Sequence, residues 1–444
     1  MRGEYKRRFL SFIASLNSFS PVYTHTLSVK ERLKSYILAN SIAGEERKLG
    51  IEVECFIFDK NNKRIPVNKS SAYSATDLLK ELDSLSNGNY SLEPGGQIEW
   101  SSPPSNKLKD IERDLLKHKN SLDKVLHREE LKSLYIGVDP FNNPGELGLI
   151  DQKKYLLMNA NMKKKGLLGK WMMRNTSSIQ INYDIIDVAD LEELTYILDC
   201  IHPITSYLFS NSPFLERKLN GNLNLRNHIW ENTDDDRCRS LIDHGISTQK
   251  NLLKSYLDFA THVPAIFKLD DELNIRESSS TLGGDLKYRF DKNALRKEDI
   301  QAALHQIFTN VRLKNLIEVR DIDCLPFEHI MAPVAFVTGL ISDKIIRKDL
   351  LLTFEKWKNI ERISWNKLGS SLDGSLIGPN KKTFLYWIEL VGRLSLKGLK
   401  NRNFGEEKYF SKYFNDIISK GPLSEQMQKN FAISDQSLDK FIFR

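Results

Sequence analysis

The chain has 444 residues, of which 40% are hydrophobic and 28% are charged, and these fractions are those of an ordinary globular protein. They argue against a disordered chain, a collagen-like fibre and a membrane bundle. Lys and Arg number 65 against 58 Asp and Glu, and the net charge of +7 is scattered along the chain. A nucleic-acid-binding protein would gather such an excess in one stripe, so small anionic molecules explain it at least as well.

The first three quarters of the chain mix helices and strands. Residues 1–20 have a basic start and a short apolar run, which predicts a surface helix, with a targeting segment as the alternative. Apolar spacing then predicts helices over 29–48, 71–85, 108–126 and 191–210. Period-two alternation predicts strands over 50–58, 176–184 and 312–320, and a hairpin over 92–100.

Beyond Pro326 the pattern is almost wholly helical. Its most apolar stretch, Ile330–Ile341, is too short to span a bilayer and predicts a core helix. Because strands and helices do not alternate regularly, we expect an α+β fold with an antiparallel sheet. We expect one domain over 1–444, with the motif-bearing part at about 50–326 and a helical remainder at 327–444.

The cysteines Cys55, Cys200, Cys238 and Cys324 are widely spaced, and none belongs to a CxxC pair. This spacing argues against a structural zinc site and against a disulfide framework. It favours a reducing compartment, and we expect a cytoplasmic protein.

Two glutamates stand on one face of the first predicted strand. In the sequence Gly-Ile-Glu-Val-Glu, Glu52 and Glu54 are two residues apart, so their side chains point the same way. Glutamate is depleted in strands. Two carboxylate charges about 4 Å apart repel by about 4 kcal/mol at an effective dielectric constant of about 20. Solvent, protonation or a cation must offset this repulsion.

Two other strands also carry polar residues on one face. That face holds Thr176, Ser178, Gln180, Asn182 and Asp184 in one strand. In the other, if no bulge intervenes, it holds Arg312, Lys314, Glu318 and Arg320. A solvated outer face is the alternative explanation for each of them.

A Pro-Gly-Gly turn separates Glu93 from Glu99. Glycine in this turn would let the backbone approach a ligand closely. The alternative explanation is an ordinary hairpin turn. If the carboxylates converge, they form a hard-oxygen site that suits Mg²⁺ or Mn²⁺ and not zinc. Lys314 and Arg320 would then face phosphate oxygens. The sequence has no GxxxxGK[ST], GxGxxG, HExxH or GxSxG motif, so a P-loop is excluded as the nucleotide site. The converging set would be Glu52, Glu54, Glu93, Glu99 and Glu318.

In these motifs the chain resembles the glutamate–cysteine ligases of the branch shared by plants and many bacteria. The motifs follow one another in family order, which makes the resemblance far more specific than any one of them. They are Gly50–Glu54, Leu92–Glu99, Met172–Asn182, Asn211–Phe214, Arg226–Trp230 and Arg312–Asp323.

The resemblance implies a glutamine-synthetase-like fold, with a curved antiparallel sheet forming a funnel and helices outside. It implies that ATP and two or three Mg²⁺ bind in the funnel, with Mn²⁺ as a possible substitute. The implied reaction joins the γ-carboxyl of L-glutamate to the amine of L-cysteine through a γ-glutamyl phosphate, the first step of glutathione synthesis. A ligase of the same fold that uses a different amine is the nearest alternative, and a basic nucleic-acid-binding protein is a distant one.

The implied roles follow from this chemistry. The five glutamates would bind metal, and Arg320, with Lys314, would stabilise the transferring phosphoryl group. Arg226 would hold the α-carboxylate of glutamate, and Trp230 would contact substrate or only support the wall. We expect no nucleic-acid or membrane partner, and a monomer or homodimer. Further residues of the amino-acid or metal pocket would be Thr176, Gln180 and Asn182.

Overall fold

The computed structural model describes residues 28–43, 47–86 and 89–443. The predicted helix or targeting segment at 1–20 lies outside the described residues. The predicted antiparallel sheet is confirmed. It has seven strands, and every pairing in it is antiparallel. The strands are β1 (Leu49–Phe58), β2 (Tyr90–Leu92), β3 (Ile98–Ser101), β4 (Lys132–Leu134), β5 (Ser178–Tyr183), β10 (Val311–Leu313) and β11 (Ile317–Asp323).

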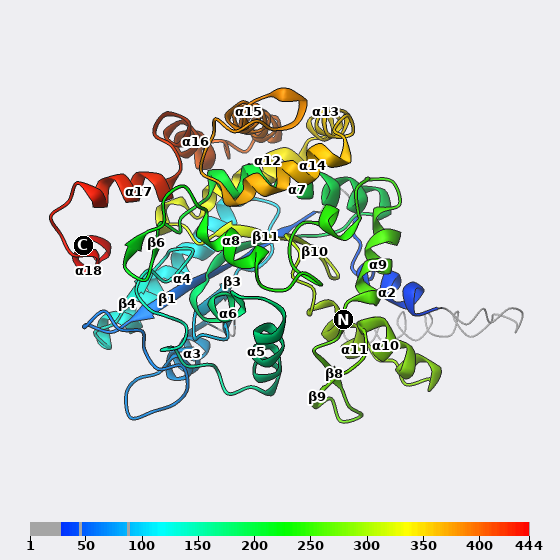
Figure 1. Cartoon of the computed structure of the whole chain (residues 1–444), viewed down its shortest axis with the longest axis horizontal. Coiled ribbons are helices and arrows are strands. Elements are labelled where there is room, and N and C mark those ends of the chain that lie inside the picture. Colours follow the sequence, from blue (N-terminus) through cyan, green and yellow to red (C-terminus); the bar gives the residue numbers. More distant parts are fainter. Residues whose placement is uncertain (1–27, 44–46, 87–88, 444) are drawn as a thin grey trace, which may run out of the picture.

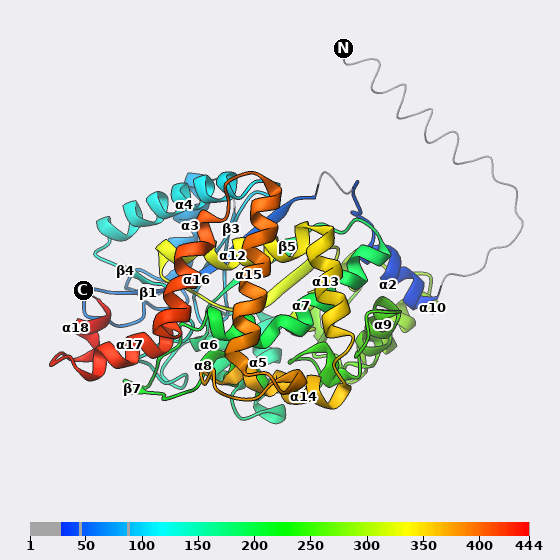
Figure 2. The same cartoon turned by 90° about the horizontal axis from the view of Figure 1, so that it is seen from above.

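The strand order is β10-β11-β5-β1-β3-β2, with β4 pairing to the far end of β1. The apolar residues of β1, such as Ile51 and Val53, are buried in the main core, and the residues between them face the other side. In Figure 1 most of the C-terminal helices lie above the sheet together with the helix over 188–208, whereas the helices over 153–175 and 282–304 lie below it. Figure 2 shows the upper layer from above. The sheet therefore has one covered apolar face and one polar face.

The helices before the last strand are more numerous than predicted. They are α2 (Val29–Ile37), α3 (Ala75–Ser86), α4 (Leu108–Arg128), α5 (Lys153–Lys165), α6 (Gly169–Asn175), α7 (Val188–Leu208), α8 (Leu225–Glu231), η2 (Leu241–His244), α9 (Leu252–His262), α10 (Leu282–Asp291) and α11 (Lys297–Leu304). Two small hairpins pair β6 (Phe214–Leu215) with β7 (Lys218–Leu219) and β8 (Phe267–Leu269) with β9 (Ile275–Glu277).

The predicted helical remainder is confirmed. It consists of η3 (Phe327–His329), α12 (Met331–Ser342), α13 (Lys344–Phe354), α14 (Asn359–Asn366), η4 (Lys367–Ser370), η5 (Pro379–Lys381), α15 (Phe384–Arg402), α16 (Lys408–Lys420), α17 (Leu423–Ala432) and α18 (Leu438–Ile442). The core helix predicted around Ile330–Ile341 is α12, which is buried throughout Met331–Ile341. Among the described helices, none alone has the length and apolarity to cross a membrane. The bent pair Phe327–Ser342 and Lys344–Phe354, at 87°, meets that test by length and composition only.

Two predicted elements were wrong in extent. The helix predicted over 29–48 ends at Ile37. Just beyond it, the hydroxyl of Ser41 donates to the carbonyl of Leu38, and this hydrogen bond competes with those of a continued helix. The strand predicted over 312–320 is a hairpin, because the chain turns at Lys314–Leu316.

The four cysteines are free and buried, and burial raises the pKa of Cys238 to about 12, which leaves its thiol unreactive.

A buried ion pair joins α7 to the sheet. The Nδ1 atom of His202 lies 2.7 Å from Oδ2 of Asp321 on β11, and both side chains are buried. Burial alone would lower the pKa of His202, but the hydrogen bond and charge of Asp321 outweigh it, with smaller effects of Glu231 and Asp199, and the pKa is raised. The folded protein therefore keeps a proton here that the unfolded chain releases.

This pair predicts that stability falls as the pH rises. The stabilisation is complete below pH 6.5, the ordinary pKa of histidine, and is lost as the pH rises through the higher pKa of the folded protein. Urea unfolding at several pH values from 6 to 9 should therefore show a free energy of unfolding that decreases with pH. The variant His202→Gln should lose this part of the pH dependence, and an unchanged slope would contradict the assignment.

Candidate active site

The polar face of the sheet brings together residues from four strands. The Cα atoms of Glu52 on β1 and Gln180 on β5 are register partners, and those of Glu54 and Glu99 on β3 face each other. On the other side of β5, Glu318 of β11 faces Asn182. Like charges directly opposite each other destabilise a sheet, so the Glu54–Glu99 pair calls for a compensating cation.

A cavity of about 550 Å³ opens on this face. It is lined by all the site residues predicted from the sequence except Asn182 and Glu318. We call four of its side chains the acidic quartet: Glu52, Glu54, Glu93 and Glu99. The predicted convergence of acidic residues is therefore found for four of the five glutamates.

The members of the acidic quartet differ in their hydrogen bonds. Glu54 accepts from the backbone N–H of Ser178 at 2.9 Å, from its hydroxyl at 2.7 Å and from the amide of Gln180 at 3.0 Å. Glu52 accepts from Asn182 at 2.9 Å, and Glu99 accepts from a serine hydroxyl of β2 at 2.6 Å. Each of these three carboxylates is turned toward a partner in the protein.

The quartet carries more negative charge than its surroundings balance. Burial, and then the charge of Glu54, raise the pKa of Glu93 to about 7. Burial and the charge of Glu93 raise the pKa of Glu99 well above its ordinary value. Burial also raises the pKa of Glu54, despite its hydrogen bonds and the charge of Arg226. A cation bound among these carboxylates would relieve the repulsion.

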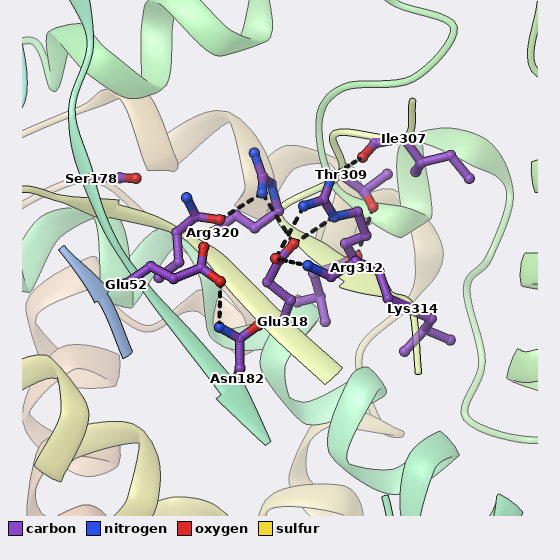
Figure 3. A network of polar contacts seen from close by, with 12 residues as sticks. Glu52, Ser178, Asn182, Ile307, Thr309, Arg312, Lys314, Glu318 and Arg320 are labelled. Atoms are coloured by element: carbon purple, nitrogen blue, oxygen red, sulfur yellow. Dashed lines mark hydrogen bonds and ion pairs between the residues drawn. The ribbon is translucent and has the colours of Figure 1, made fainter. Parts of the chain in front are cut away.

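Glu318 lies in a different environment, which we call the basic hub. Its side chain is 0% exposed, and Lys314 Nζ lies 2.6 Å and Arg320 Nη1 3.0 Å from its oxygens, while Arg312 binds both oxygens. Figure 3 shows the three cations pointing toward Glu318. Burial alone would raise the pKa of Glu318, but the three positive charges hold it well below its ordinary value. The hub places a concentrated positive charge beside the acidic quartet.

Arg320 connects the hub to the quartet. Its Nη1 atom donates to Oε1 of Gln180 at 2.6 Å, and Gln180 in turn donates to Glu54. Because Arg312 and Glu318 are register partners across the hairpin, their side chains share a face. The predicted shared face is therefore real, although its cause is a turn and not one continuous strand.

Three other predicted pocket residues form part of the cavity wall. Arg226 is buried on α8, and its Nη2 donates to the carbonyl of Arg320 at 2.9 Å. The ring centre of Trp230 lies 5.8 Å from the guanidinium carbons of both arginines. Thr176 lines the cavity, but its hydroxyl donates to the carbonyl of Met172 at 2.6 Å and closes the end of α6.

The Pro-Gly-Gly turn packs against the protein itself. A Cβ on Gly95 would lie 2.6 Å from the Cα of Arg174, and Gly96 has a φ of +79°. Glycine at these positions lets the turn touch the end of α6 and fixes Glu93 at the cavity. The close approach of the backbone is therefore made to α6, which differs from the ligand contact considered from the sequence.

Comparison with known proteins shows the family of the chain. The profile of Glutamate-cysteine ligase family 2 (GCS2) matches residues 48–440. The chain belongs to this family. It is 29% identical over 404 residues to the chloroplastic glutamate–cysteine ligase of Arabidopsis thaliana, covering 86% of this chain and 76% of that protein. It is 27% identical over 405 residues to the chloroplastic enzyme of Nicotiana tabacum, with the same two coverages.

Solved structures support the fold. The glutamate–cysteine ligase of Francisella tularensis, solved in complex with AMP, aligns with a TM-score of 0.50 at 11% identity, covering 90% of this chain and 97% of that one. A bifunctional glutathione synthetase from Pasteurella multocida also aligns with a TM-score of 0.50, at 12% identity, covering 94% of this chain and 54% of that one. At these identities the likeness shows that the chain shares their fold.

The sequence did not predict several of the residues that line the cavity. One wall comes from α5, and the facing wall comes from β8, β9 and α11. Its apolar and basic side chains carry no motif, so only a knowledge of the tertiary packing could have found them. Among them are Lys154, Tyr155, Met158, Phe267, Leu269, Ile275, His305 and Phe308.

The acidic quartet fits a hard divalent cation by its chemistry, since carboxylate oxygens are the ligands that Mg²⁺ and Mn²⁺ prefer. In the arrangement described, no three Asp, Glu, His or Cys side chains within 28–43, 47–86 and 89–443 stand close enough together to hold a metal ion. The hydrogen bonds of Glu52, Glu54 and Glu99 to protein partners explain this, because each turns its oxygens toward a neighbouring strand. A metal would have to draw these side chains inward.

Proposed function

We propose that this protein is an ATP-dependent glutamate–cysteine ligase, which joins the γ-carboxyl of L-glutamate to the amine of L-cysteine and releases ADP and phosphate. The observation that carries the proposal is the meeting of the acidic quartet and the basic hub in one cavity of a chain that belongs to this family. A carboxylate is a poor acyl donor, so it must first be phosphorylated before an amine can displace the phosphate. The site must therefore hold two anions against each other.

The chain's own residues divide this task. The side chain of Arg320 is 13% exposed and donates to Glu318 and Gln180, and it would neutralise charge on the transferring phosphoryl group. Lys314 would assist from the same hub. Arg226, held by the carbonyl of Arg320, would bind the α-carboxylate of glutamate. Gln180 and Thr176 line the amino-acid side of the cavity, and Asn182 orients Glu52.

The acidic quartet would hold two or three Mg²⁺ ions, or Mn²⁺ in their place. When bound, such ions supply positive charge to phosphate oxygens and so lower the cost of bringing anions together. Glu318, predicted as a fifth ligand, is already neutralised by three cations. We therefore propose the quartet alone as the metal set.

The decisive experiment measures phosphate release by the purified protein with ATP, Mg²⁺ and L-glutamate, adding L-cysteine or another amine in turn. We expect release to depend on cysteine and to stop when EDTA removes the metal. Release with a different amine at a higher kcat/KM would instead support the same-fold alternative. Steeply salt-dependent binding to DNA or RNA without phosphate release would support the nucleic-acid alternative.

Replacing Arg320 with lysine should reduce kcat about 100-fold, the size seen when one group that stabilises developing charge is lost. Lysine keeps the charge but cannot reach both Gln180 and Glu318, as Arg320 does at 2.6 Å and 3.0 Å. The melting temperature should stay close to that of the wild type, because Arg312 and Lys314 still neutralise Glu318. The exposed Arg113→Lys is the control, and a kcat within a few-fold of wild type for Arg320→Lys would remove Arg320 from the catalytic set.

We also propose that residues 1–444 act as a single catalytic domain, since one hydrophobic core extends from Leu33 to Ile417. The cytoplasmic location and the monomeric or homodimeric state stay predictions. The plant relatives are named as chloroplastic proteins.

A further inference from the structure

A very small cavity lies behind the wall of the active-site pocket, between α8 and β11. Its volume is about 10 Å³. That is at the small end of the roughly 10–15 Å³ that one water molecule needs. Arg226, Trp230, Arg320 and Asp321 are among the residues that line it. The first three also line the active-site pocket, so the two cavities share a wall.

Three buried polar atoms of these lining residues have no hydrogen-bond partner within the described part of the chain. They are Nε of Arg226, Nε1 of Trp230 and Oδ1 of Asp321. Arg226 is 4% exposed and Asp321 is 6% exposed, so bulk water does not satisfy them. Buried polar groups are nearly always hydrogen-bonded, and each exception needs an explanation.

The three atoms complement a single water molecule. Two of them, Nε–H of Arg226 and Nε1–H of Trp230, are donors, and the Asp321 oxygen is an acceptor. One water can accept two hydrogen bonds and donate one, and buried waters typically make about three. No direct pairing satisfies all three atoms, because two donors and one acceptor leave a donor over.

We propose that one buried water molecule is bound in this cavity, accepting from Arg226 and Trp230 and donating to Asp321, and that Asp321 thereby positions Arg226 for substrate. The part that concerns substrate rests on the proposed function, in which Arg226 binds the α-carboxylate of glutamate. Asp321 does not line the active-site pocket, so it is a positioning residue and not a catalytic one.

Each end of the proposed chain of contacts is anchored. The other oxygen of Asp321, Oδ2, lies 2.7 Å from Nδ1 of buried His202 on α7. The Nη2 atom of Arg226 donates to the backbone carbonyl of Arg320, the residue that precedes Asp321. The carbonyl and the water together would hold two edges of the guanidinium. Its remaining donor edge would then be free to face the pocket.

The water itself is tested by a crystal structure of the full chain at a resolution that shows ordered solvent. We expect one density peak in this cavity, within hydrogen-bonding distance of the three atoms. An empty cavity, or side chains that pair with one another instead, would overturn the proposal. This test involves no substrate, so its outcome does not depend on whether the protein is a ligase.

The positioning role is tested by steady-state kinetics of two variants. Asp321→Leu removes the acceptor, whereas Asp321→Asn keeps an oxygen for the water. The Asn amide nitrogen then faces Nδ1 of His202, which must be deprotonated to accept from it. For Asp321→Leu we expect KM for glutamate to rise about tenfold, as for the loss of one hydrogen bond to a charged group. Its kcat and its KM for ATP should change less than about twofold, and Asp321→Asn should restore KM for glutamate to near the wild-type value.

A matched control separates positioning from general destabilisation. Asp190 is also buried and pairs with Arg347 at 2.7 Å, at the opposite end of α7. Asp190→Leu should lower the melting temperature without changing KM for glutamate. Equal rises of KM in Asp321→Leu and Asp190→Leu would overturn the positioning role. A wild-type protein that releases no phosphate would instead contradict the proposed function, and the crystal structure would then decide the water alone.

Discussion

Replacing Glu93 with glutamine should raise the thermal stability of the metal-free protein and abolish its ATP turnover. No hydrogen bond to the side chain of Glu93 is found among the described residues, and burial with the charge of Glu54 raises its pKa to about 7. Removing this charge relieves repulsion from Glu54 and Glu99, and each ~1 kcal/mol relieved should raise the melting temperature by about 2 °C. The same change removes a proposed metal ligand, so turnover should fall at least about 100-fold.

The two effects are measured separately. Melting is followed in EDTA and again with Mg²⁺, and phosphate release is followed with saturating substrates. The wild type should gain stability from Mg²⁺, and Glu93→Gln should gain much less. The exposed Glu130, which pairs with Lys60, supplies the control variant Glu130→Gln, which should change neither quantity. If Glu93→Gln turns over ATP at nearly the wild-type rate, Glu93 does not belong to the metal set.

Replacing Glu318 with glutamine should have the opposite effect on stability. The carboxylate is wholly buried among Arg312, Lys314 and Arg320. Without it three largely buried cations, each at most 13% exposed, face one another. Removing one partner of a buried ion pair typically costs about 3–5 kcal/mol. We therefore expect the free energy of unfolding, measured by urea denaturation in EDTA, to fall by about that amount.

A second variant makes this prediction specific. In the double variant Glu318→Gln/Arg312→Leu, one of the unbalanced cations is also gone, and part of the lost stability should return. A role of Glu318 as a metal ligand predicts a different result. Glu318→Gln would then leave the stability in EDTA unchanged and would weaken only the stabilisation by Mg²⁺.

The sequence predicted those parts of the site that depend on local periodicity. Glu52 and Glu54 share a face because side chains alternate along a strand. The register then places Glu52 opposite Gln180 of β5 and Glu54 opposite Glu99 of β3. The shared face of Arg312 and Glu318 was also predicted, but through a continuous strand, whereas a turn at Lys314–Leu316 produces it. The alternation of polar and apolar residues cannot distinguish a continuous strand from a hairpin when the turn leaves the same residues on one face.

Features created by tertiary contacts could not be predicted in this way. His202 and Asp321 are separated by 119 residues, and neither stands in a pattern that points to the other. Lys154 and Tyr155 belong to a helix whose ends are basic, and they become cavity residues only because α5 packs against α6 and β9 beside the cavity. The hydrogen bonds that turn Glu54 toward Ser178 and Gln180 likewise depend on strands far apart in the chain.

The strand order also has a consequence for synthesis of the chain. One edge of β1 pairs with the nearby β3, but its other edge waits for β5, and the contact between Glu54 and Gln180 spans 126 residues. At roughly 5–20 residues per second, a ribosome needs about 6–25 s to make that stretch. Throughout this interval an apolar strand has an open hydrogen-bonding edge, which invites aggregation. Slower growth at low temperature, or extra chaperone, should therefore increase the soluble yield.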